Sequence, residues 1–194
     1  MTKGKLDPEL LLTAYASGVF PMAEHKQDAS VFWVEPKRRG VLPLDGFHIS
    51  HSMRRFLKKG VFQVTFDTAF KDVMEACADR EETWINGQIL EGYCRLFELG
   101  FAHSVETRKD GRLIGGLYGV SLGGAFFGES MFSKETNASK TALCALVARL
   151  KEKGFVLLDT QFLTSHLASL GGIEIPQEEY LEQLKKALHL NVMF

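Results

Sequence analysis

The order of the predicted elements indicates an α+β fold with a central, mostly antiparallel sheet and flanking helices. Predicted strands follow one another directly from residue 102 to residue 127, a pattern typical of antiparallel hairpins. One long helical pattern then leads from this region to a further predicted strand at residues 155–159, as a crossover helix does. Apolar residues make up 45% of the 194-residue chain and charged residues 24%, which is enough apolar material for a sizeable core.

Capping residues set the ends of the predicted helices. Ser, Thr, Asp and Asn accept hydrogen bonds at helix starts, and glycine or proline favours the turns that bound a helix. Asp7 and Pro8 form a cap and first helical residue, while Asn137 and Ser139 are candidate caps for the longest helix. The predicted helices cover residues 8–17, 51–59, 68–78, 86–99, 140–153, 166–170 and 177–188.

Runs of β-branched and aromatic residues between turn signals set the predicted strands. Asp110-Gly111 and Gly123-Gly124 are the two clearest turn signals, and each joins a pair of strands. The predicted strands cover residues 31–34, 41–44, 61–66, 102–109, 112–120, 125–127 and 155–159. Because the basic, strand-poor part of the chain ends near Gly60, we predict a small N-terminal domain at 1–60 and a second domain at 61–194.

Glycines gather in the two central strands, with six of them between Gly115 and Gly128. Glycine weakens a strand, so this density predicts bulges or the close approach of another group to the backbone. The patterns GxxxxGK[ST] and GxGxxG do not occur, so a nucleotide-phosphate loop is not predicted. The acid that follows the glycines, Glu129, is either a salt-bridged residue at the edge of the core or a functional carboxylate.

A second acid, Asp159, is predicted at the end of a strand and is followed by Thr160 and Gln161. Alone, Asp159 could simply cap the next turn. If strand pairing brings it close to Glu129, two carboxylates could bind a cationic group or orient a base, and burial would shift their pKa. His103-Ser104 is not a catalytic dyad, because neighbouring residues on a strand point to opposite faces.

Charge and composition restrict the classes of partner. The net charge is −1, so a nucleic acid would have to meet a local basic patch. The segment from residue 37 to residue 59 contains seven Lys or Arg and one acid, which suits either a phosphate-binding surface or a solvated helix face.

The cysteines and histidines do not predict a metal site. The chain has three Cys and six His without a CxxC or HExxH pattern, so we expect free thiols in a reducing cytoplasm. No 18-residue apolar run and no apolar N-terminal signal segment is present, and we expect a cytoplasmic protein.

Taken together, the motifs resemble those of the bacterial leucyl/phenylalanyl-tRNA–protein transferases. The similarity extends over nearly the whole chain in the right order, and its most specific segments are residues 100–106 (GFAHSVE) and 127–133 (FGESMFS). The other matching segments are residues 11–15 (LLTAY), 18–21 (GVFP), 47–50 (FHIS), 52–53 (SM), 83–85 (TWI), 115–120 (GGLYGV), 137–140 (NASK), 159–161 (DTQ) and 169–171 (SLG).

The resemblance implies a small N-terminal α/β domain followed by an acetyltransferase-like (GNAT) domain. The implied activity moves Leu or Phe, and less well Met, from aminoacyl-tRNA to the α-amino group of a protein that begins with Arg or Lys. That product is an N-degron, which marks the protein for degradation. The implied partners are Leu-tRNA or Phe-tRNA and the acceptor protein, with no metal or other cofactor, and a monomer is expected.

The resemblance also assigns catalytic residues. Glu129 and Asp159 match acids that face the acceptor, and Gln161 matches a glutamine that attracts a proton from the acceptor amine while Asp159 polarises it. A neutral amide is a poor base, so an alternative is that these three residues hold the cationic N-terminal residue in place. Because the aminoacyl ester is already activated, positioning could supply much of the rate.

Further residues are assigned to the donor and its tRNA. The implied substrate-binding residues are Trp33, Trp84, Ser130, Met131 and Phe132. The residues expected to contact tRNA phosphates are Arg38, Arg39, Arg54, Arg55, Lys58 and Lys59. A narrow apolar slot would accept Leu, Phe and Met and disfavour side chains branched at Cβ.

This chain departs from the family pattern at several positions, and these departures bear mainly on donor preference. Val34 stands where a second Trp is frequent, Thr160 where Cys is usual, and Gln177 where Arg is common, and the chain starts without the family's longer N-terminal segment. Two rival hypotheses are an acetyltransferase-like enzyme that uses acyl-CoA and a tRNA-binding module without catalysis. The presence of Glu129, Asp159 and Gln161 argues against the second.

Overall fold

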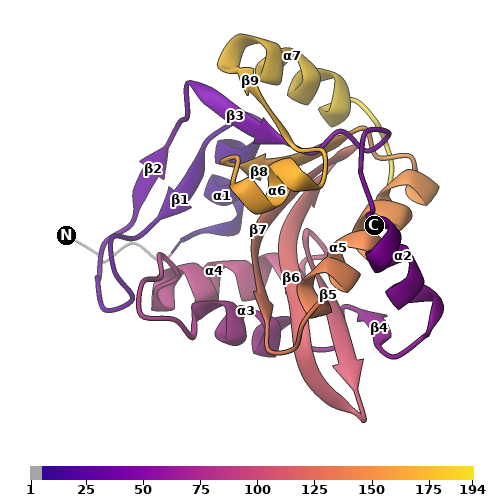
Figure 1. Ribbon diagram of the computed structural model, residues 1–194. Helices are drawn as coiled ribbons and strands as arrows, with labels where there is room; N and C mark the ends of the chain where they lie inside the picture. The colour runs from indigo at the N-terminus through magenta and orange to yellow at the C-terminus, as the bar shows by residue number, and fades with distance from the viewer. Residues whose placement is uncertain (1–5) are drawn as a thin grey trace.

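The computed structural model describes residues 6–194 and contains helices and strands in mixed order (Figure 1). The helices are α1 (Pro8–Ala16), α2 (His51–Lys58), α3 (Phe70–Ala78), α4 (Gly87–Glu98), α5 (Ala138–Lys153), α6 (Ser165–Ser169) and α7 (Gln177–Leu188). The strands are β1 (Phe20–Met22), β2 (Phe32–Val34), β3 (Arg38–Val41), β4 (Gln63–Phe66), β5 (Ala102–Lys109), β6 (Arg112–Leu122), β7 (Ala125–Ser133), β8 (Leu157–Gln161) and β9 (Ile173–Pro176).

Seven strands form one sheet in the order β4-β5-β6-β7-β8-β3-β9, and β1 and β2 form a separate hairpin. Every pairing in the large sheet is antiparallel except that of β7 with β8, which is parallel and is connected through α5. The predicted α+β fold with a mostly antiparallel sheet and one crossover helix is therefore confirmed.

Helices cover both faces of the sheet, and each face has its own apolar core (Figure 1). Alternation along β6 and β7 supplies the two cores: Tyr118 and Phe127 pack on the side of α1, α3 and α4, whereas Leu117 and Phe126 pack on the side of α5. Within residues 6–194, no helix has the length and apolar character needed to cross a membrane.

Most predicted helix starts are confirmed by cap hydrogen bonds. The Asp7 side chain accepts from Glu9 N at 2.9 Å, and Asn86, Ser50 and Thr164 cap α4, α2 and α6 in the same way. The predicted start of α5 is wrong by two residues. The helix begins at Ala138, where Asn137 adopts a left-handed backbone (φ 70°) and makes no side-chain cap bond.

Several strand predictions need correction. The strand expected at residues 41–44 lies at β3, three residues earlier, and β1 and β9 were not predicted. The strand expected to end at Phe127 continues to Ser133, because pairing along β6 outweighs the low strand propensity of Gly128 and Glu129. Asp159 lies within β8, two residues before the strand ends, and its side chain caps the turn of the bulge there by accepting the backbone N–H of Gln161.

Three bulges interrupt the sheet, and two of them lie at the candidate acids. The bulges between β5 and β6 and between β6 and β7 fall in the glycine-rich strands, as the glycine density predicts. Between β6 and β7 the register passes from Tyr118↔Ser130 to Gly119↔Gly128, so Glu129 is the extra residue. A Cβ on Gly119 would lie 2.3 Å from the carbonyl oxygen of Phe127, so only glycine fits there. Bulges re-aim side chains and occur next to active sites.

The other bulge at a candidate acid lies between β3 and β8. There the register passes from Gly40↔Gln161 to Val41↔Asp159, which makes Thr160 the extra residue. A Cβ on Gly40 would lie 2.6 Å from the backbone carbon of Phe162, so the close approach again requires glycine. Glu129 is thus the bulged residue of β7, and Asp159 directly precedes the bulged residue of β8.

Candidate active site

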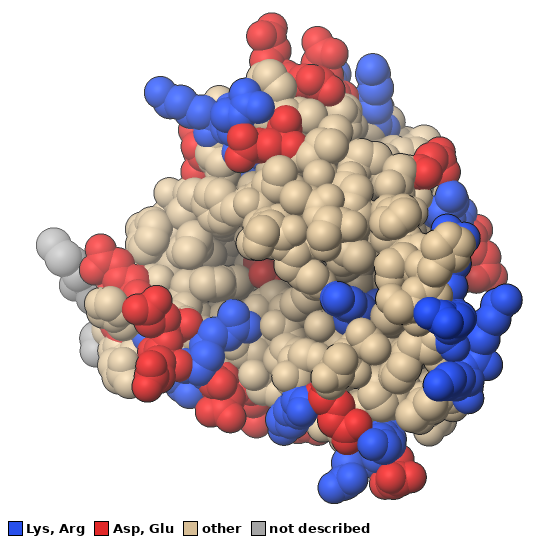
Figure 2. All heavy atoms as spheres, viewed as in Figure 1, with Lys and Arg blue, Asp and Glu red and all other residues tan. Residues whose placement is uncertain are grey.

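A pocket opens where the parallel pairing of β7 with β8 stops. The last paired residues are Phe127 and Asp159, and the residues that follow on each strand, 128–131 and 160–162, line the pocket. Its volume is about 290 Å³. Figure 2 shows a hollow near the centre of this face of the molecule, with acidic side-chain atoms at its floor.

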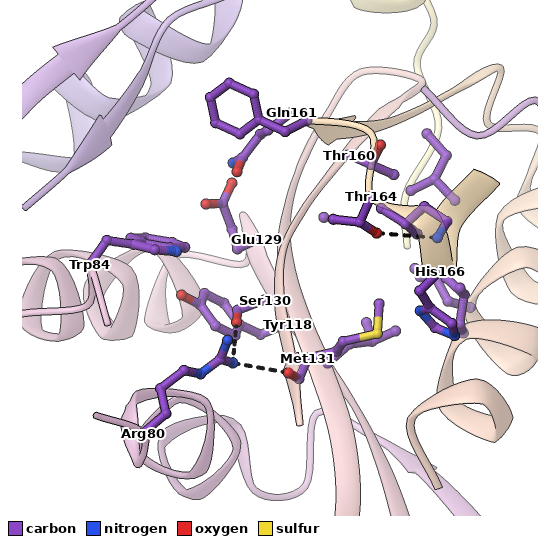
Figure 3. Close-up of a pocket in the computed structure, with 17 residues that line it drawn as sticks. Arg80, Trp84, Tyr118, Glu129, Ser130, Met131, Thr160, Gln161, Thr164 and His166 are labelled. Carbon is purple, nitrogen blue, oxygen red and sulfur yellow. Dashed lines mark hydrogen bonds between the residues drawn. The ribbon is translucent and has the colours of Figure 1, made fainter. Parts of the chain in front are cut away.

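The pocket has an apolar side and a polar side (Figure 3). The mostly apolar side is formed by Leu117, Met131, Leu143, Leu146, Leu158 and Leu167, with Thr160, Thr164 and His166 beside them. The polar side is formed by Arg80, Trp84, Tyr118, Glu129, Ser130 and Gln161. A site built in this way can hold a group that has both an apolar body and a polar or charged end.

Glu129 is a buried carboxylate with phenol partners. Tyr15 Oη donates to its Oε1 at 2.6 Å. Tyr93 Oη lies 3.3 Å from its Oε2 and also within hydrogen-bond distance of Tyr15 Oη, so the single Tyr93 proton serves one of these two partners. Among the described residues no Lys or Arg forms a salt bridge with Glu129, so the salt-bridged alternative is wrong. Burial raises the pKa of Glu129 from 4.5 to about 7, although the Tyr15 hydrogen bond opposes this shift.

Asp159 is fully buried and its carboxylate is saturated with donors. Arg39 Nε lies 3.0 Å from Oδ1 and Arg39 Nη2 lies 2.7 Å from Oδ2, a bidentate ion pair. Tyr180 Oη donates to Oδ2 at 2.6 Å, and the backbone N–H of Gln161 donates to Oδ1 at 2.7 Å. Asp159 therefore lies beneath the pocket without lining it.

Gln161 joins the two acids. Its side chain points toward Glu129 from the opposite strand (Figure 3), while its backbone is tied to Asp159. The residue is 6% exposed and has a left-handed backbone with φ 63°, which few residues other than glycine adopt. The structure thus brings Glu129, Asp159 and Gln161 together, as the sequence suggested for the two acids.

Unpartnered polar atoms mark the pocket. Four buried side-chain polar atoms in the described part of the chain have no hydrogen-bond partner, and three of them belong to pocket-lining residues: Tyr118 Oη, Thr160 Oγ1 and Gln161 Nε2. Each such atom costs about 1–3 kcal/mol if it stays unpaired. Their concentration in one pocket leaves several polar groups there that can bond to a polar group of a ligand or to water.

The predicted substrate-binding residues divide into two groups. Trp84, Ser130 and Met131 line the pocket, whereas Trp33 on β2 and Phe132 on β7 do not. Trp33 is 40% exposed on the β1–β2 hairpin. Phe132 packs against the core on the α3 side, because it follows Met131 and so points to the other face.

Sequence reasoning missed five residues of the site: Tyr15, Arg80, Tyr93, Tyr118 and Tyr180. Arg80 Nη2 bonds to Ser130 Oγ and to the Met131 carbonyl oxygen, both at 3.1 Å, at the pocket edge (Figure 3). The chain contains only four tyrosines, and all four are fully or almost fully buried at or next to this site. No local pattern distinguishes such tyrosines from core aromatics, so their role depends on the assembled fold.

The predicted tRNA-contacting residues do not all reach the surface. Arg54, Arg55 and Lys58 are exposed on α2, with Lys59 directly after it. Figure 2 shows Lys and Arg gathered at the right edge of this face, where α2 lies in Figure 1. Arg38 is exposed but forms an ion pair with Glu174 at 2.6 Å.

Arg39 has to be removed from this set. Its guanidinium is 1% exposed and paired with Asp159, so it is not available to a phosphate. Arg38, the preceding residue on β3, is exposed, because successive side chains of a strand point to opposite faces of the sheet.

His103 and Ser104 take separate structural partners. His103 bonds to Asp67 Oδ2 at 2.9 Å and to Ser121 Oγ at 3.0 Å, while Ser104 donates to buried Glu106. The expectation that they do not form a dyad is confirmed. Within residues 6–194, no group of three or more His, Cys, Asp or Glu is arranged to hold a metal ion.

The fold and the pocket together define a class: an α+β protein with a half-apolar pocket that ends at buried acidic and amide groups. Residues 41–185 match the family model of the leucyl/phenylalanyl-tRNA protein transferases, and residues 4–37 match the model of that family's N-terminal domain. The chain belongs to this family and is an aminoacyltransferase. The sequence-based identification is therefore confirmed.

Individual relatives agree. A leucyl/phenylalanyl-tRNA–protein transferase of Ruegeria pomeroyi is 59% identical over 184 residues, which cover 95% of this chain and 88% of the relative. One of Zymomonas mobilis is 55% identical over 187 residues, covering 94% of this chain and 70% of the relative. A ribosomal-protein-alanine N-acetyltransferase of Brucella melitensis aligns with a TM-score of 0.41 and 12% identity over 57% of this chain and 87% of that one. A similarity this weak carries no argument.

Proposed function

We propose that this aminoacyltransferase moves Leu or Phe, and less well Met, from aminoacyl-tRNA to the α-amino group of proteins that begin with Arg or Lys. The observation that carries the proposal is the pocket itself, in which a buried carboxylate, without a salt-bridge partner among the described residues, faces an apolar cavity. An ionised Glu129 would attract a cationic acceptor group. The apolar side would hold the unbranched-at-Cβ side chain of the donor.

The chemistry needs little beyond positioning. The acceptor nitrogen forms an amide bond with the acyl carbon, the ester C–O bond breaks, and the proton lost by the amine neutralises the departing ribose oxygen. Because the ester is already activated, holding amine and ester in contact accounts for much of the expected acceleration. Gln161 faces the pocket beside Glu129, so it is placed to accept a hydrogen bond from the attacking amine.

We assign the pocket-lining residues Trp84, Ser130 and Met131 to the donor. Leu, Phe and the side chains branched at Cβ are all apolar, so the apolar side is expected to separate them by size and shape, by about 10- to 200-fold per methyl group. Residues Arg54, Arg55, Lys58 and Lys59 supply an exposed basic surface that would meet phosphates of the tRNA, with binding that weakens as salt rises.

The remaining expectations belong to the same proposal. We keep the division between a small N-terminal domain and an acetyltransferase-like domain at residues 60 and 61 as a prediction, with β3 of the first part contributing a strand to the sheet of the second. We also expect a cytoplasmic monomer whose product is an N-degron. No cofactor enters the proposed reaction. Arg38 retains a role in tRNA binding only if its exposed ion pair with Glu174 opens, which costs little at the surface.

The decisive experiment measures transfer of labelled Leu from Leu-tRNA to a protein that begins with Arg, beside the same protein beginning with Ala. Labelling of the Arg protein alone supports both the reaction and the acceptor rule. Labelling of neither protein, with tRNA still bound, would favour a tRNA-binding module. Saturable binding of acyl-CoA without tRNA binding would instead favour the acyl-CoA hypothesis.

A further inference from the structure

A buried clamp lies directly beneath the pocket and is connected to it through the backbone. We define the clamp as Arg39, Asp159 and Tyr180, whose side chains are each at most 1% exposed. The guanidinium of Arg39 makes a fork with both carboxylate oxygens of Asp159, and the Tyr180 hydroxyl donates to one of them. None of the three lines the pocket, so none is placed to touch a substrate there.

The clamp is itself held rigidly. The guanidinium of Arg39 lies between two aromatic rings, 4.7 Å from the centroid of Phe20 and 4.5 Å from that of Tyr180. Its Nη1 donates to the carbonyl oxygen of Gly18 at 2.8 Å. The clamp therefore ties together the α1–β1 connection, β3, β8 and α7, and fixes the position of the Asp159 carboxylate relative to all of them.

The clamp is connected to the pocket-lining residue Gln161 by a single hydrogen bond from Asp159. Asp159 Oδ1 accepts the backbone N–H of Gln161 at 2.7 Å, which closes a side-chain turn across the bulged residue Thr160. Gln161 is held there with φ 63°, a conformation that costs a residue other than glycine about 1–3 kcal/mol. Strain of this kind persists only where the surroundings enforce it, and here it turns the Gln161 amide toward Glu129 (Figure 3).

Burying the Arg39–Asp159 ion pair costs desolvation free energy, so its presence is better explained by something other than stability. Replacing a buried ion pair by packed apolar residues is often neutral or stabilising, so a pair of this kind is weak support for stability alone. An ion pair does, however, specify geometry, because the planar guanidinium fork fits a carboxylate in one orientation.

We propose that Arg39 and Tyr180 are positioning residues of the transfer reaction. They orient Asp159, and Asp159 then holds the left-handed backbone of Gln161 so that its side chain faces the acceptor amine. The reaction itself rests on the function proposed above, whereas the mechanical link from Tyr180 to Gln161 does not.

The mechanical link is tested without substrate by amide hydrogen exchange. Tyr180→Phe removes one donor from Asp159, and Thr107→Val is the matched control because it removes a buried hydroxyl bond (3.0 Å, to the Ala138 carbonyl) away from the pocket. We expect the Gln161 N–H to exchange at least about tenfold faster in Tyr180→Phe and within about twofold of the parent in the control. Equal exchange in parent and Tyr180→Phe, or an equal rise in both variants, would overturn the proposal.

The functional link is tested by a double-mutant cycle with single-turnover transfer from Leu-tRNA. Tyr180→Phe and Arg39→Lys, which keeps the charge and loses the fork, should each slow transfer by about tenfold while the Kd for tRNA stays within about twofold. In a Gln161→Ala background the same changes should have no further effect, because the residue they position is gone. The same loss in both backgrounds would show that Arg39 and Tyr180 act otherwise. If the parent transfers no Leu, the proposed function fails, and the exchange result still decides the clamp.

Discussion

Glu129 and Asp159 are two carboxylates on neighbouring strands, each at a bulge, and the protein uses them in opposite ways. Asp159 receives an arginine fork, a tyrosine hydroxyl and a backbone N–H. Glu129 receives tyrosine hydroxyls, and it lines the pocket. A saturated carboxylate can hold the chain in place, whereas one that is not paired with a cation retains its attraction for a substrate.

The difference also separates stability from function. Arg39 offsets much of the electrostatic cost of burying Asp159, so the fold is expected to lose stability when either partner is removed alone. No salt bridge within residues 6–194 removes the cost at Glu129, whose pKa is raised by burial to about 7. The protein thus retains a destabilised group where the pocket needs one, as functional sites often do.

The largest effect on stability should come from removing Asp159, whose carboxylate pairs with Arg39. Asp159→Ala leaves the Arg39 charge buried and unpaired, so the free energy of unfolding should fall by about 3–5 kcal/mol in a urea titration. Transfer should be abolished, while the folded fraction still binds tRNA. The double variant Arg39→Met, Asp159→Leu is the control, and it should recover much of the lost stability because no lone charge remains. A loss below about 1 kcal/mol in the single variant would contradict this account.

The contribution of Glu129 to the free energy of unfolding should depend on pH. Because the pKa of Glu129 is about 7 in the folded protein against 4.5 ordinarily, the folded state keeps a proton that the unfolded chain loses over this interval. This contribution to stability is present below about pH 4.5 and is lost as pH rises to about 7, a change on the order of 3 kcal/mol.

Glu129→Gln isolates that contribution. Relative to this variant, the parent protein should become less stable between about pH 5 and pH 8 in denaturant titrations. Transfer by the parent should rise over the same range as the carboxylate ionises, and the variant should transfer poorly at every pH. A parent-minus-variant difference that does not vary with pH would show that Glu129 titrates as an ordinary surface acid.

Tyr180 and Tyr118 allow the same comparison with smaller expected changes in the free energy of unfolding. Tyr180→Phe removes a hydrogen bond to a buried carboxylate and should cost about 1.5–3 kcal/mol of unfolding free energy. Tyr118→Phe removes a buried hydroxyl that has no partner in the described part of the chain, so stability should stay within about 0.5 kcal/mol or rise. Transfer should still slow if Tyr118 pairs with the substrate. Equal stability losses in the two variants would mean that the Tyr118 hydroxyl is paired in solution.

The smallest effect on stability should come from the basic surface. Arg54→Ala and Arg55→Ala alter exposed side chains on α2, so unfolding should change by less than about 0.5 kcal/mol. If both residues meet tRNA phosphates, the slope of log K against log salt should fall by roughly 0.7–0.9 for each phosphate that is no longer neutralised. An unchanged slope in filter-binding or fluorescence titrations would remove α2 from the proposed interface.

Local interactions made much of the fold predictable. The N-caps at Asp7, Ser50 and Asn86 and the hairpin turn at Asp110-Gly111 depend on residues within a few positions of one another, and the structure confirms them. The strands that the sequence misplaced or missed, β1, β3 and β9, are short and take their structure from distant partners. Pairing with a remote strand outweighs weak local propensity, so a local pattern could not locate them.

The sequence by itself determined the family and the α+β class, and it predicted Glu129, Asp159 and Gln161 as candidate site residues. Only the tertiary structure decided that Asp159 forms an ion pair and that, among the described residues, Glu129 does not. The basic segment that includes Arg39 suggested a tRNA contact, yet Arg39 lies 120 residues from Asp159 in the chain and pairs with it in the core. Such a pairing arises when β3 inserts beside β8, and the energy of burying a charge depends on its neighbours in space, which adjacent residues do not reveal.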